Sequence, residues 1–274
     1  MSSSQIVHTI VTEFPFALLG SLVAGILCAY LSVYVVSKRI VFVGATLTQV
    51  ALAGIAFAHL PFIHVDPIIG SVLFTLAVVV IFARLLQSRV VPRDSVLGAG
   101  FVIAIALRIL LIEKSPAAEA SEIEAILKGD ILFVTASQFY LLLAVAVVLL
   151  TIHILFYKEF IFIAFDPETA ATQGYRATRW ELLFYLTVGI AISVAIRMVG
   201  DVFVFGFLVI PAISAILLAR KVTSIFILAA LFGAIPPIAG LYLAFKLDIP
   251  AGPTTVATGF ALLCASWTLN KLRR

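Results

Sequence analysis

Charged residues are scarce in this sequence. Only 12% of its 274 residues are Asp, Glu, Lys or Arg, while 63% are hydrophobic. A soluble globular domain is about 25% charged and about 45–50% apolar, so a water-soluble fold of this length would lack the polar surface that it needs. Lipid leaves only helices or closed barrels as spanning structures, and the apolar runs are too long for barrel strands. We therefore expect an all-α polytopic membrane bundle that forms one domain over residues 1–274.

The sequence also lacks the common signatures of catalysis and of metal binding. It contains no phosphate-binding loop of the form GxxxxGKS or GxxxxGKT, no HExxH, no GxSxG and no CxxC. Cys28 and Cys264 lie in apolar runs, so neither a disulfide framework nor a zinc cluster is expected. His59, His64 and Asp66 lie close together in the chain and could bind a divalent cation transiently, but we favour the interpretation as a solvated turn. The chain is thus expected to be no enzyme, to bind no cofactor and to have no nucleic-acid partner.

Long apolar runs dominate what is present. A helix needs about 20 apolar residues to cross a bilayer core of about 30 Å. On this criterion we expect about 8–9 transmembrane helices in contact with membrane lipid, and the second, fourth and seventh are short enough to be tilted or broken. The candidate spans are 14–36, 40–58, 67–87, 96–112, 138–157, 181–199, 202–219, 223–246 and 253–270.

Positive charges gather between alternate spans. If the nine candidates alternate across the membrane, thirteen of the eighteen Lys and Arg residues fall on one side, which the positive-inside rule assigns to the cytoplasm. The N-terminus then lies outside and the C-terminus inside a bacterial-type inner membrane. The thirteen are Lys38, Arg39, Arg84, Arg89, Arg93, Lys158, Arg176, Arg179, Arg220, Lys221, Lys271, Arg273 and Arg274.

Acidic residues show the opposite distribution. Most of them, among them Glu119, Glu122 and Glu124, fall on the outer side or at its membrane edge. A negative outer surface would raise the local concentration of cations. The alternative is that acidic residues simply avoid the positively charged inner loops.

The segment at about 158–180 joins the fifth and sixth spans on the cytoplasmic side. Asp166 fits an N-cap, Pro167 the first helical position and Glu168 an acid in the first turn, while Gly174 suits the left-handed residue after a helix C-terminus. A helix of fewer than two turns is marginal in water on its own. This segment is either a connector on the membrane surface or a short cytoplasmic helix that docks on a partner protein.

Polar side chains inside membrane spans are functional candidates by default. Thr46, Thr48 and Gln49 lie near mid-membrane depth and have to face protein or water. Arg108 and Arg197 lie nearer the outer edge, where an arginine can snorkel to the surface, and Asp201 can pair with Arg197. No chain of acidic residues suited to proton relay lies within the spans. The candidates for a substrate pathway are Gln49, Thr46, Thr48 and Asp201.

Five segments, taken in order, resemble the membrane subunit of the family of ABC importers for divalent zinc, manganese and iron. Each segment is mostly apolar and weak alone, whereas five in the same order and on the same sides of the membrane are fairly specific. They are KRIVFVGATLTQVALAGIAFA, LKGDIL, EFIFIAFDPETAATQGY, VGDVFVFGFLVIPAISAILLAR and GLYLAFKLDIPAGPTTV.

The resemblance implies a non-catalytic permease that works as a pair of such subunits, most simply a homodimer. Two cytoplasmic ATPase subunits would bind and hydrolyse ATP, and an extracytoplasmic solute-binding protein would deliver the substrate. The FDPETAATQG segment matches the family's coupling helix. The resemblance therefore assigns contact with the ATPase to Asp166, Glu168, Ala171 and Gly174.

One departure from the family concerns its metal ligands. Members usually carry an acidic residue after a glycine at the start of the second span and a histidine four positions later. Here the glycine is Gly44, and those positions are Ala45 and Gln49. An amide offers a carbonyl oxygen without charge, and alanine offers no ligand. The metal ligands are thus unknown, and a metal complex or a different small solute stays open beside a divalent metal ion.

Two other classes of protein compete with an ATP-driven permease. A secondary transporter or channel would work without ATP, but it would need its own coupling-ion site or repeat symmetry, and neither is visible. A membrane-embedded enzyme would need a catalytic group set at one depth, and the sequence shows none. Co-purification of an ATPase subunit with the chain would discriminate between these classes.

Overall fold

Helices account for the regular structure of the described chain, in which no strand occurs. The computed structural model describes residues 3–63, 65–85, 92–116, 131–165 and 176–273. An all-α architecture is confirmed, and among the described residues eight helices are long and apolar enough to cross a membrane. The contacts divide the chain into two compact units: residues 1–36, 125–146 and 195–274 form unit 1, and residues 37–124 and 147–194 form unit 2.

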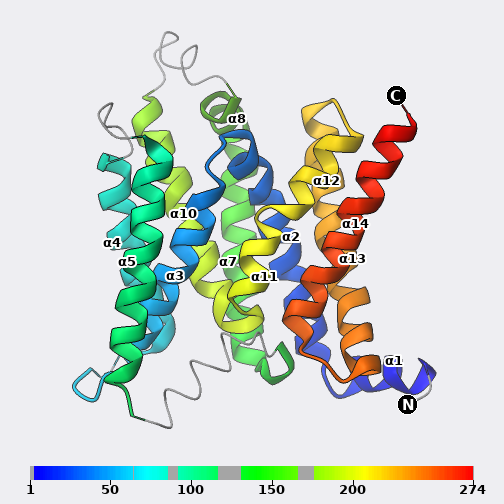
Figure 1. Ribbon diagram of the computed structural model, residues 1–274, viewed down its shortest axis with the longest axis horizontal. Helices are drawn as coiled ribbons and strands as arrows, with labels where there is room; N and C mark the ends of the chain where they lie inside the picture. The colour runs from blue at the N-terminus through cyan, green and yellow to red at the C-terminus, as the bar shows by residue number, and fades with distance from the viewer. Residues whose placement is uncertain (1–2, 64, 86–91, 117–130, 166–175, 274) are drawn as a thin grey trace. The chain divides into compact units, whose positions relative to one another are not determined.

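Unit 2 is built around α3 (Val41–Ala58), which packs against both α4 (Pro67–Leu85) and α5 (Arg93–Glu113). The three helices run side by side (Figure 1). The end of α7 (Ala136–Leu155), α8 (Tyr157–Phe165) and most of α10 (Ala177–Val199) complete this unit.

Two glycines allow α3 and α4 to approach closely. A Cβ atom added to Gly54 would lie 2.6 Å from the carbonyl oxygen of Gly70, and one added to Gly70 would lie 2.6 Å from that of Gly54. Small residues at such crossings let two helix backbones pack by direct contact, which is a common way to associate helices in lipid. A hydrogen bond also joins α4 to α10, since Ser193 Oγ donates to Thr75 Oγ1 at 2.9 Å.

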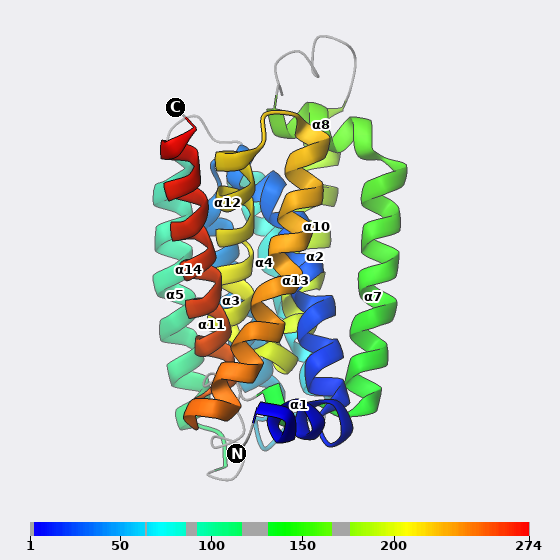
Figure 2. The same cartoon turned by 90° about the vertical axis from the view of Figure 1, so that its right-hand side faces the viewer.

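Unit 1 contains α1 (Ser3–Thr12), α2 (Pro15–Ser37), the 3-10 turn η1 (Ile131–Phe133) and the chain from α11 to the C-terminus. The long helices α13 (Val222–Leu247) and α14 (Ala251–Leu272) pack against each other, and α12 (Ile210–Leu218) packs against both. In Figure 2, α1 runs across the end of α13, where Tyr242 donates a hydrogen bond to Ser3 Oγ at 2.9 Å.

A second glycine contact lies beside the double proline of α13. Neither Pro236 nor Pro237 has an N–H group, so the carbonyl of Gly233 has no helical donor four residues on. This carbonyl faces α2, where a Cβ added to Gly25 would lie only 2.3 Å from it. Both glycines are required here because any side chain at Gly25 would displace α2 from α13.

The expected spans correspond to helices of the structure, with differences at particular places. The expected span 202–219 is interrupted: α11 (Asp201–Phe207) and α12 are separated by Leu208 and Val209. The span expected at 253–270 is helical as α14, but it lies outside the eight helices that are apolar enough to cross a membrane. Thr, Ser and Asn side chains along α14 account for this difference.

Two helices were not expected from the sequence. The ten-residue α1 precedes the first span, and its buried residues Ile6 and Ile10 are one helical turn apart. The nine-residue α8 occupies the beginning of the segment at about 158–180 that joins the fifth and sixth expected spans. Both helices are too short for the length criterion of a span, so apolar periodicity over one or two turns was their only signal.

Candidate functional site

Two polar residues of α3, Thr46 and Thr48, form hydrogen bonds with backbone carbonyl groups. Thr46 is fully buried, and its hydroxyl lies 2.8 Å from the carbonyl oxygen of Phe42 and 3.0 Å from that of Leu97 on α5. Thr48 donates to the carbonyl oxygen of Ala45 at 2.7 Å. Both hydroxyls thus donate to backbone carbonyls, which satisfies them in an apolar surrounding.

Gln49 makes a long-range contact. Its Oε1 atom accepts a hydrogen bond from Nη1 of Arg108, on α5, at 2.6 Å, and both side chains are half-buried. A charged donor shortens and strengthens such a bond. The structure therefore joins two polar groups of membrane-spanning helices that lie 59 residues apart in the sequence.

Arg108 does not snorkel toward the nearer end of its helix. It precedes Glu113, the last residue of α5, by five residues, yet its guanidinium group reaches Gln49, nine residues before the end of α3. The Cα–Cβ bonds of a helix tilt toward its N-terminus, so the side chain of Arg108 leaves α5 in this direction. That tilt agrees with a partner nearer the middle of the helix, but it does not identify the partner, which our sequence interpretation missed.

The two positions at which the resemblance implies metal ligands hold Ala45 and Gln49 in this chain. Ala45 is buried, with 6% exposure, and lies one turn before Gln49, whose oxygen is bound to Arg108. Over the described ranges no group of three or more His, Cys, Asp or Glu residues lies close enough together to hold a metal ion. At the position that the resemblance implies for a metal ligand, Gln49 instead forms an amide–guanidinium pair with Arg108.

Asp201 belongs to the other unit. It is the first residue of α11, directly after Gly200, whose φ of 81° ends α10. Its Oδ1 atom accepts a hydrogen bond from the N–H group of Val202 at 2.7 Å. A carboxylate at this position interacts favourably with the first turn of the helix, so Asp201 has a local structural role.

The histidines of the described chain bind neighbouring groups of the protein. His59 Nδ1 lies 2.9 Å from the carbonyl oxygen of Ile55, one turn back in α3, and Asp66 accepts the N–H group of Ile68 at the start of α4. His153 Nε2 lies 2.9 Å from Thr187 Oγ1. Since Thr187 donates its single proton to Phe184, the network makes His153 Nε2 the donor.

The proposed coupling residues Asp166, Glu168, Ala171 and Gly174 lie outside the described residues. Both flanks of their segment are described, and Lys38 contacts both. Its ammonium group donates to the carbonyl oxygen of Ile163, in α8, at 2.7 Å and to Glu181, in α10, at 3.0 Å. The Lys38 side chain is 4% exposed and that of Glu181 is 18% exposed, so this is a buried ion pair in the connection between α2 and α3.

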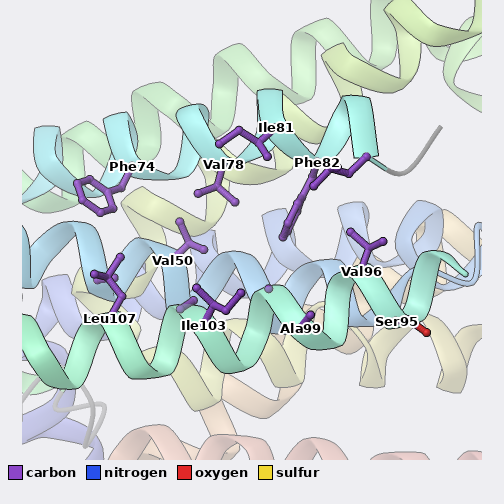
Figure 3. Close-up of a pocket in the computed structure, with 14 residues that line it drawn as sticks. Val50, Phe74, Val78, Ile81, Phe82, Ser95, Val96, Ala99, Ile103 and Leu107 are labelled. Carbon is purple, nitrogen blue, oxygen red and sulfur yellow. The ribbon is translucent and has the colours of Figure 1, made fainter. Parts of the chain in front are cut away.

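Unit 2 also contains an apolar cavity of about 480 Å³ between α3, α4 and α5. Figure 3 shows Phe74, Val78 and Phe82 of α4 on one side and Ala99 and Ile103 of α5 on the other. Ser95, at one end, is its one polar side chain. The wall offers no group suited to an ion, so this cavity is not the candidate site.

Known proteins resemble this chain over most of its length. The manganese transport system membrane protein MntC of Listeria monocytogenes is 27% identical over 240 residues, which cover 88% of this chain and 84% of that protein. A probable iron transport system membrane protein of Haemophilus influenzae is 27% identical over 243 residues, which cover 88% and 84% of the two chains. The structure of PsaBC from Streptococcus pneumoniae in complex with Fab has a chain with the same fold, with a TM-score of 0.86 over 99% of both chains at 22% identity.

The family assignment depends on the sequence as a whole, because no single motif of this chain is diagnostic. Residues 13–269, which include each of the eight described helices that are long and apolar enough to cross a membrane, match one family, the ABC 3 transport family. The chain therefore belongs to the ABC 3 transport family.

Proposed function

We propose that this chain is the membrane-spanning permease subunit of an ATP-driven importer for a divalent metal ion or a metal complex. The family match over residues 13–269 carries this proposal. The relatives named for manganese and iron transport, which align over most of their own length, support metal as the cargo.

ATP hydrolysis is assigned to a separate cytoplasmic subunit, since the sequence contains no phosphate-binding loop. A second copy of the chain would complete the membrane part as a homodimer, and an extracytoplasmic solute-binding protein would supply the cargo. The N-terminus would lie outside and the C-terminus in the cytoplasm, as the distribution of Lys and Arg indicates.

The ATPase would contact the segment that includes Asp166, Glu168, Ala171 and Gly174. Its cap residues support a short helix, and such a helix needs a docking partner to be stable. Lys38 supports the same assignment, because it ties the described flanks of this segment to the start of α3. Movement of the ATPase would thereby be transmitted to the helix that carries Gln49.

Replacing Gly174 with valine tests this docking. Valine is strained in the left-handed conformation that a residue after a helix C-terminus adopts, so the variant should lose ATPase association and ATP-driven uptake. Co-purification of the ATPase with the tagged chain and manganese uptake into proteoliposomes measure the two effects. Gly98→Ala, on α5, is the control, since nothing lies within 4 Å of its added Cβ atom. Unchanged association and uptake in Gly174→Val would refute the docking.

The class of transporter is tested by the same reconstitution. A permease of this kind should move its cargo only with the ATPase and hydrolysable ATP present. Uptake by the purified chain alone, driven by an ion gradient, would instead identify a secondary transporter.

A further inference from the structure

The apolar cavity of unit 2 is a groove that has α3 as its floor. Both α4 and α5 pack closely against α3, whereas in the described chain their backbones make few contacts with each other, so a space stays open between them. Figure 3 shows Val50 of α3 between Phe74 of α4 and Ile103 of α5. Val50 is 4% exposed and Ile103 is 65% exposed, so the groove is closed on the side of α3 and open on the other. In a membrane-spanning chain, the open side faces lipid or another apolar surface.

The dimensions of this groove fit one hydrocarbon chain. Its lining runs from Phe74 to Leu85 on α4 and from Ser95 to Leu107 on α5, which at 1.5 Å per residue is about 16–18 Å. One leaflet, half of a hydrocarbon core of about 30 Å, is about 15 Å deep. A volume of about 480 Å³ over this length leaves a mean cross-section of about 28 Å². A helix with side chains is about 10–12 Å across, so it needs about three times this area and does not fit inside.

Polar and positively charged residues lie at one end of the groove. Ser95, at the start of α5, contributes its one polar side chain. Arg84, in the last turn of α4, follows Ile81 of the groove lining by three residues, so the two share a helix face. Arg84 is exposed and forms no ion pair within the part of the chain that the structure describes. The sequence adds positive charge at this end, since residues 84–95 contain three arginines and one aspartate.

We propose that this groove binds one anionic phospholipid, with an acyl chain between α4 and α5 and the phosphate group at Arg84. A guanidinium group donates strong, charge-assisted hydrogen bonds to phosphate oxygens, and basic sites beside transmembrane helices recognise anionic headgroups at the cytoplasmic surface. The positive-inside rule assigns the end that carries Arg84 to this surface. The proposal goes beyond the transport function and does not depend on the cargo.

The acyl chain and the headgroup contribute differently to this binding. Between lipid and protein there is no hydrophobic driving force, because the surrounding lipid tails are as apolar as the groove. Close van der Waals contact holds the chain, since an unfilled groove would leave its walls without partner atoms. The charge at Arg84 then provides the preference for an anionic over a zwitterionic headgroup.

Two substitutions separate these contributions, each with a matched control. Ala99 is exposed and lines the groove, so Ala99→Phe fills it from α5, and Ala99→Leu fills less of it. Val102→Phe is the control, because Val102 is 64% exposed on the same helix and lies outside the groove lining. Arg84→Gln removes the charge, and Lys221→Gln, at an exposed position of unit 1, is its control.

The first experiment measures lipid binding to the purified full-length chain by native mass spectrometry. Dioleoylphosphatidylglycerol and dioleoylphosphatidylcholine are the probes, which share their acyl chains and differ in charge. The wild-type chain should bind the anionic lipid about tenfold more tightly, and Arg84→Gln should remove most of this preference. Ala99→Phe should weaken the binding of both lipids about tenfold, and Ala99→Leu should give an intermediate loss. Both control variants should bind as the wild type does.

The variants are compared only where their thermal unfolding without added lipid matches that of the wild type within a few degrees. Equal affinity of the wild-type chain for the two lipids, or retention of neither, would overturn the proposal. The same conclusion would follow if Ala99→Phe and Ala99→Leu bound lipid like Val102→Phe, or if Arg84→Gln kept the full preference.

A second experiment locates the acyl chain in the wild-type protein. A phosphatidylglycerol with a photoactivatable diazirine at the end of one acyl chain should label α4 and α5 near Phe74 and Leu107, at the end of the groove away from Arg84. Excess unlabelled phosphatidylglycerol should abolish the labelling, whereas inorganic phosphate should not. Labelling spread over the exposed helix faces of both units would indicate surrounding bulk lipid only and would overturn the site.

A second copy of this chain is the competing occupant of the groove. In that case the wild-type chain would be a dimer in detergent, and Ala99→Phe would dissociate it without weakening lipid binding. Size-exclusion chromatography with light scattering measures the oligomeric state of both proteins. An unchanged oligomeric state together with weaker lipid binding supports the lipid site, and dissociation with unchanged lipid binding would refute it.

Discussion

At the scale of single residues, the buried ammonium group of Lys38 holds together three separate parts of unit 2. It bonds α8 through Ile163 and α10 through Glu181, and it stands next to Arg39, whose φ of 56° is uncommon for a residue other than glycine. The two bonds of Lys38 hold the short connection between α2 and α3 in this conformation. The sequence identified Lys38 only as one of the positive charges that orient the chain in the membrane. The burial of its ammonium group could not be predicted, because the residues next to it in the sequence do not show which helices cover it.

Lys38→Met should lower the free energy of unfolding by about 2 kcal/mol. The loss of one partner from a buried ion pair costs about 3–5 kcal/mol, and the partial exposure of Glu181 reduces that figure. Thermal unfolding in detergent measures the change, with Lys221→Met, at an exposed position of unit 1, as the control. Equal unfolding temperatures of the two variants would show that the ion pair does not stabilise unit 2.

The candidate site could be predicted only in part. Gln49 was accessible from the sequence because an amide at mid-membrane depth needs a polar partner. Arg108 could not be predicted as the partner of Gln49, because their hydrogen bond depends on how α3 packs against α5. The hydrogen bonds of Thr46 and Thr48 could not be predicted either. In the sequence, a hydroxyl group that donates to its own helix cannot be distinguished from one that lines a pathway.

At the scale of helices, length and hydrophobicity predicted most of the fold. The apolar runs marked the spans because lipid admits no other arrangement. The break between α11 and α12 was within the expectation for the seventh span, and Pro211, at the start of α12, lies directly after it. The close crossing of α3 and α4 depends on Gly54 and Gly70, and a glycine alone does not reveal which helix it faces.

Gly54→Ala should lower the free energy of unfolding by about 1–3 kcal/mol, the usual cost of overpacking a core. The added methyl group would lie 2.6 Å from a backbone oxygen of α4, so the two helices would have to separate. Gly98→Ala provides the comparison on α5, where the space is open and alanine favours the helix by about 1 kcal/mol. Thermal unfolding should therefore shift in opposite directions for the two variants, and a shift in the same direction would refute the glycine crossing.

At the scale of the whole molecule, the orientation in the membrane that the charge distribution predicts can be measured. In a Cys264→Ser background, an impermeant thiol reagent should label Ser3→Cys in intact cells and Arg273→Cys only after permeabilisation. Cys28 is fully buried and gives little background. The reverse pattern of labelling would invert the topology and move the coupling segment outside.

The acidic residues of the expected outer surface should act on the rate of uptake. Neutralising Glu119, Glu122 and Glu124 together should slow uptake more at low than at high salt, because surface fields are screened over about 8–10 Å at ordinary ionic strength. The wild-type chain measured over the same salt series is the reference. Unchanged or faster uptake by the variant would contradict this prediction and would indicate a cargo of zero or negative charge. The sign of the effect therefore reports the charge of the cargo as it arrives.

The inward direction of Arg108 also has a consequence for how the protein is made. An arginine within a membrane helix raises the cost of insertion, by about 2.5–3.5 kcal/mol where it lies at the helix centre. The chain is synthesised from its N-terminus, so α3 emerges before α5 and the amide of Gln49 is in place when the arginine arrives. The insertion of α5 would therefore depend on its earlier neighbour, and the biogenesis of unit 2 would have a fixed order.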